Sequence, residues 1–116
     1  MYLPKAYETF VKTYPQIQKQ YQELATSCRE SGPLDVKAQS LVKLGIAIGA
    51  NSRGGVMSSV RKALEAGATA EEIRHAVLMS LTPTGFPNMI VAMEWASEVL
   101  EQQKDPAAKK VSRKKK

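Results

Sequence analysis

Apolar residues recur at helical spacing along almost the whole chain. Between Asp35 and about Ala50 they form one stripe, made of Ala38, Leu41, Leu44, Gly45 and Ile48. The same spacing continues in three later segments, with Val56, Val60, Ala63 and Leu64, then Ile73, Ala76, Val77 and Leu81, then Met89, Ala92, Met93, Ala96, Val99 and Leu100. No stretch alternates with a period of two, so the pattern predicts an all-α protein without a sheet.

Proline, glycine and capping residues predict where these helices begin and end. Residues 4–30 are expected to form one or two helices, with Pro15 at a break or in a new first turn. Their apolar anchors are Tyr7, Phe10, Ile17, Tyr21 and Leu24. Ser31-Gly32-Pro33 stops this region, and the helix after residues 35–50 is expected to start near Gly54.

The helix ends in the second half of the chain are marked by specific capping residues. Gly67 is expected to close the helix that starts near Gly54, and Thr69 with Glu72 forms a capping box for the next helix. A loop is predicted around Pro83, Gly85 and Pro87, followed by a last helix over residues 88–103. The sequence thus predicts a helical bundle of five to six helices.

Charge divides the chain into a neutral body and a basic tail. Residues 1–103 hold ten Lys/Arg and ten Asp/Glu, so the net charge of +6 comes from KDPAAKKVSRKKK, residues 104–116. We expect one domain over residues 1–103 and a disordered tail over residues 104–116. The tail has no aromatic residue for base stacking, so nucleic-acid binding is expected only weakly, through charge alone.

The remaining composition favours a cytoplasmic protein. The longest apolar run, residues 44–50, is too short to span a bilayer, so no membrane partner is expected. The N-terminal residues do not have the pattern of a signal peptide, and a single cysteine fits a reducing compartment. That cysteine, Cys28, is expected to be a half-buried packing residue rather than a sensor thiol. His75, the one histidine, is expected to pair with Glu71 or Glu72 on the helix surface.

The segment from Leu34 to Val77 resembles the carboxymuconolactone decarboxylase and alkylhydroperoxidase-D-like family. The resemblance rests on the helix lengths and on LEAGATAEEI, residues 64–73, and it covers roughly residues 33–100. It implies the alkylhydroperoxidase-D-like helical fold and a homo-oligomer, with a dimer, a trimer and a hexamer as the alternatives. In peroxide-reducing members of the family, two helices of this kind carry a Glu, two Cys and a His. That arrangement lets a thiolate at a helix start react and a second thiol resolve it.

In this sequence the resemblance places those four roles at Ser40, Ser52, Gly55 and Ser59. No Cys, His, Asp or Glu lies between Gln39 and Lys62, so shifting the register does not recover them. A hydroxyl without an adjacent base is a poor nucleophile, and glycine offers no side chain. The sequence therefore predicts a family member without the dithiol peroxidase site, with no metal site and no cofactor.

The same helix start retains groups that suit an anion. Arg53 can pair with a carboxylate, and Ser52, Gly54 and Gly55 can present amides, while Ser58 and Ser59 add hydroxyls. A cap-and-turn role for Ser52 and the glycines explains the same residues. Two hypotheses stay open: a non-redox helical oligomer with a small-ligand or anion pocket, or a thiol-independent decarboxylase or lactone-acting enzyme on a small carboxylated metabolite.

Overall fold

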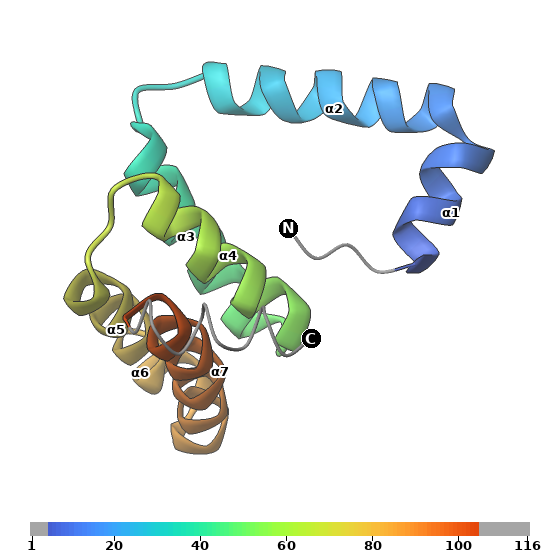
Figure 1. Cartoon of the computed structure of the whole chain (residues 1–116). Coiled ribbons are helices and arrows are strands. Elements are labelled where there is room, and N and C mark those ends of the chain that lie inside the picture. The colour runs from blue at the N-terminus through green and yellow to red at the C-terminus, as the bar shows by residue number, and fades with distance from the viewer. Residues whose placement is uncertain (1–4, 105–116) are drawn as a thin grey trace. The chain divides into compact units, whose positions relative to one another are not determined.

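The computed structural model describes residues 5–104, without the side chains of residues 103 and 104. Within this range every regular element is a helix, as predicted. The helices are α1 (Lys5–Thr13), α2 (Pro15–Glu30), α3 (Val36–Gly49), α4 (Arg53–Glu65), α5 (Ala70–Leu78), α6 (Leu81–Thr84) and α7 (Phe86–Lys104), shown in Figure 1. Six of the described helices have nine residues or more and α6 has four, so the predicted five to six helices are confirmed with one short addition.

The chain divides into two compact units, Met1–Pro33 and Leu34–Lys116, which we describe separately. The first holds α1 and α2, with Pro15 in the first turn of α2, where its missing amide removes no helical hydrogen bond. Neither helix has a buried residue. The prediction of a single domain over residues 1–103 stays a prediction. The predicted disordered tail lies outside the described residues, except for Lys104 at the end of α7.

The second unit holds the hydrophobic core. α3 and α4 are joined by a tight turn and contact each other along their length, and α7 packs against α3, α4 and α5 (Figure 1). The buried side chains are Leu44, Ile48, Val56, Val60, Ala63, Ala68, Ile73, Val77, Met89, Ala92, Ala96, Val99 and Leu100. All of them except Ala68 were predicted by helical periodicity, whereas Gly45, predicted on the same stripe as Leu44, is exposed.

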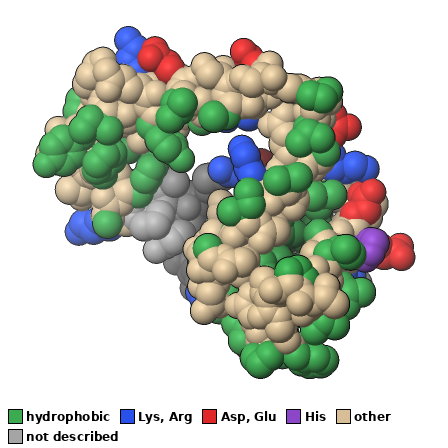
Figure 2. All heavy atoms as spheres, turned by 180° about the vertical axis from the view of Figure 1, so that it is seen from behind, with side chains coloured by type: hydrophobic (Ala, Val, Ile, Leu, Met, Phe, Trp, Pro, Cys, Tyr) green, Lys and Arg blue, Asp and Glu red, His purple; other side chains and the backbone are tan. Residues whose placement is uncertain are grey.

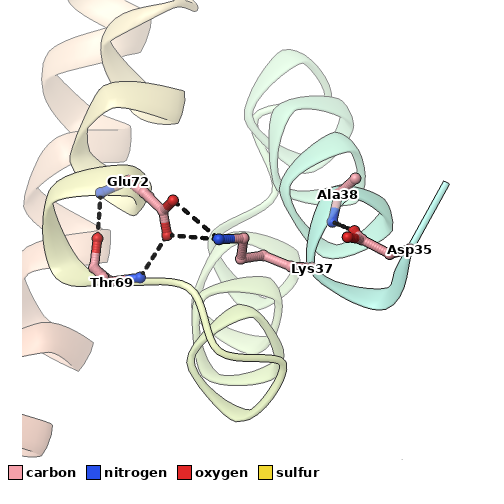
Figure 3. A network of polar contacts seen from close by, with 5 residues as sticks. All are labelled: Asp35, Lys37, Ala38, Thr69 and Glu72. Carbon is pink, nitrogen blue, oxygen red and sulfur yellow. Dashed lines mark hydrogen bonds and ion pairs between the residues drawn. The ribbon is translucent and has the colours of Figure 1, made fainter.

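A capping box starts α5, and its glutamate also forms an ion pair with α3. The Thr69 hydroxyl accepts a hydrogen bond from the Glu72 amide (3.0 Å), and the Glu72 carboxylate accepts one from the Thr69 amide (2.9 Å), which confirms the capping box. Lys37 of α3 donates to the same carboxylate, with an N–O distance of 3.1 Å (Figure 3). The backbone hydrogen bond from Thr69, followed by the bond from Lys37, lowers the pKa of Glu72, against a smaller opposing effect of burial.

Three expectations need correction. The segment around Pro83, Gly85 and Pro87 is not a plain loop, because Pro83 lies within α6 and Pro87 in the first turn of α7. Proline is tolerated in a first turn, where no intrahelical bond is lost. Glu72 is held by Lys37 and Thr69 rather than by His75, which is exposed. Cys28 is exposed rather than half-buried. Among the described residues, no helix is long and apolar enough to cross a membrane.

Candidate functional site

The turn between α3 and α4 places the candidate residues at the start of α4. Asn51 has a positive φ of 54°, and the Ser52 amide donates to the carbonyl of Ala47 (3.1 Å), which reverses the chain within a few residues. Asparagine tolerates this left-handed conformation better than most residues. Ser52 follows in an extended conformation as the N-cap of α4. The predicted helix start near Gly54 is therefore moved one residue earlier, to Arg53.

Ser52 uses both of its oxygens to cap α4. Its Oγ accepts a hydrogen bond from the Gly55 amide (3.0 Å), and its carbonyl accepts one from the Val56 amide (2.8 Å). The bond from Val56 is the first backbone hydrogen bond of α4, whereas the bond from Gly55 satisfies a first-turn amide that has no backbone partner in the helix. One first-turn amide is thus already occupied by the Ser52 side chain. The cap-and-turn role that the sequence offered for Ser52 is the role the structure shows.

Gly55 lies where a side chain does not fit beside this cap. A Cβ placed on Gly55 would be 2.8 Å from Ser52 Oγ and 3.2 Å from Ala47 Cβ. The first distance is shorter than real Cβ contacts, so the serine would have to move. Gly54 is the matched contrast, since a Cβ there would meet nothing within 4 Å. The absence of a side chain at position 55 is therefore tied to the hydroxyl at position 52.

Arg53 is paired within the chain. Its Nη2 lies 3.2 Å from Oε1 of Glu98 on α7, and both side chains remain partly exposed, by 59% and 43%. The guanidinium thus already holds a carboxylate, the group proposed for a substrate. Sequence reasoning missed Glu98 because 45 residues separate the partners. Only the packing of α7 against α4 brings them together, and no local spacing signals it.

The remaining candidates bring no acid or base to this region. Ser40 on α3 and Ser58 and Ser59 on α4 are partly buried, whereas Ser52, Arg53 and Gly54 are exposed. Across residues 5–104, no three His, Cys, Asp or Glu side chains lie together in a way that could hold a metal ion. The candidate residues on α3 and α4 therefore offer hydroxyls, amides and the guanidinium of Arg53, which is paired with Glu98. That set suits capping and hydrogen bonding, and it lacks an evident proton-transfer group.

A comparison with protein families matches residues 15–98 to the carboxymuconolactone decarboxylase family. The chain belongs to this family. The match runs from the first residue of α2 to Glu98 of α7, so it includes the whole α3–α4 region and leaves out α1. It confirms the family resemblance that LEAGATAEEI indicated.

The fold is shared with a solved member of the family. A carboxymuconolactone decarboxylase family protein from Legionella pneumophila, crystallised in its apo form, has a TM-score of 0.74 and 23% sequence identity to this chain. The similarity covers 84% of this chain and 87% of the Legionella protein. No curated protein sequence matches the chain. At this identity the likeness establishes the all-helical fold.

Proposed function

We propose that this member of the carboxymuconolactone decarboxylase family has no dithiol peroxidase activity and acts as a non-redox helical homo-oligomer in the cytoplasm. The observation that carries the proposal is the geometry at Ser52 and Gly55. In the register that the family resemblance gives, these are the two thiol positions, and here one caps α4 while the other has no room for a side chain beside that cap. The residue types at positions 52 and 55 and the local structure around them therefore both argue against a pair of reactive thiols.

The other two positions support the same reading. Ser40 and Ser59 stand where the resemblance puts the Glu and the His, and a serine hydroxyl titrates too high to act as a base at neutral pH. The carboxylate that lies next to the start of α4 belongs to Glu98 of α7, and it is paired with Arg53. A serine nucleophile needs an adjacent base to become reactive. The groups around α3 and α4 thus support neither thiol chemistry nor serine-based acyl transfer.

Peroxide turnover tests this proposal directly. The full chain is mixed with hydrogen peroxide and a dithiol reductant, and consumption of peroxide is compared with reductant alone. We expect no turnover above that background. Cys28→Ser is the matched control, because Cys28 is the one thiol of the chain and is exposed. Turnover in the parent chain that disappears in Cys28→Ser would overturn the proposal, since a thiol would then do the chemistry.

Arg53 supports a second candidate function. It holds a carboxylate at a helix start, so a small carboxylated ligand could replace Glu98 on the same guanidinium. In that case the chain would be a thiol-independent enzyme acting on lactones or small acids, or a binder of such anions through Ser52, Arg53, Gly54, Gly55, Ser58 and Ser59. A panel of small lactones and carboxylates separates the two candidates. Conversion that is lost in Arg53→Ala but kept in Glu98→Gln would favour the enzyme.

A further inference from the structure

We draw no further inference here: the strongest candidate, the surface patch of exposed apolar side chains on α1 and α2 (Figure 2), which includes Ile17, Tyr21 and Leu24, carries no proposal because nothing in the structure shows what covers it.

Discussion

Replacing Gly55 with alanine tests whether the cap at Ser52 and the missing side chain at position 55 are coupled. The new Cβ would lie 2.8 Å from Ser52 Oγ and 3.2 Å from Ala47 Cβ. Ser52 can relieve the first contact only by rotating away from the Gly55 amide, which removes the cap. Loss of a serine N-cap costs about 1 kcal/mol, within a range of roughly 0.5–2 kcal/mol. The tight contact with Ala47 adds to this cost.

Gly54→Ala isolates this cost from the general benefit of replacing glycine in a helix. Both glycines lie in the first turn of α4, so both gain the same helix propensity from alanine. A Cβ on Gly54 meets nothing within 4 Å. We therefore expect Gly55→Ala to be less stable than Gly54→Ala by about 1–2 kcal/mol. Urea unfolding of the two variants, followed by circular dichroism at 222 nm, measures the difference.

A double-mutant cycle identifies the serine hydroxyl as the cause. In a Ser52→Ala background the 2.8 Å contact no longer exists, and only contacts of 3.2 Å remain for the new Cβ. Gly55→Ala should then cost less than it does in the parent chain, with a coupling free energy of roughly 0.5–1.5 kcal/mol. Equal stabilities for Gly54→Ala and Gly55→Ala, or strict additivity with Ser52→Ala, would refute the reasoning.

Three further predictions concern the stability of the second unit. Ile73→Ala, which truncates a fully buried side chain, should lower the free energy of unfolding by about 2–5 kcal/mol in urea titrations. Thr69→Ala removes one half of the capping box and should lower the free energy of unfolding by about 1 kcal/mol. A loss of stability no larger than experimental error would contradict the role of the cap. Because the pKa of Glu72 is lowered in the folded chain from a reference of 4.5, its contribution is present above pH 4.5 and is lost as the pH falls through the folded value. In Glu72→Gln the melting temperature should therefore fall less than in the parent chain as the pH is lowered below 4.5. The same fall in both chains would argue against this contribution of Glu72.

Sequence alone predicted the parts of the fold that depend on neighbours along the chain. The capping box of Thr69 and Glu72 is confirmed because both of its hydrogen bonds join residues three apart. Helical spacing identified buried residues such as Leu44 and Val60, since one face of each helix must meet the core. The family assignment came from the same local pattern around residues 64–73.

The interactions that sequence reasoning missed all join distant segments. Arg53 meets Glu98 on α7, and Lys37 of α3 meets Glu72 on α5, and neither partner follows from a spacing along one helix. The apolar anchors of the first helical region were identified from the sequence, yet Tyr7, Phe10, Ile17, Tyr21 and Leu24 are all exposed. Gly45 was placed on the inner face of α3, whereas the structure leaves it exposed. A period of 3.6 residues cannot by itself separate a stripe that faces the core from one that is exposed.

At the start of α4, the residues at positions 52 and 55 depend on each other. A hydroxyl at position 52 that caps the helix occupies the space that a side chain at position 55 would need, so serine at one position favours glycine at the other. Restoring a cysteine at position 55 alone would remove a cap without supplying a reactive pair. Restoring a cysteine at position 52 alone would leave a thiol with neither a resolving partner nor the His and Glu positions filled. Ser52 and Gly55 therefore act together as one cap that stabilises the start of α4, and under the function proposed above neither takes part in redox chemistry.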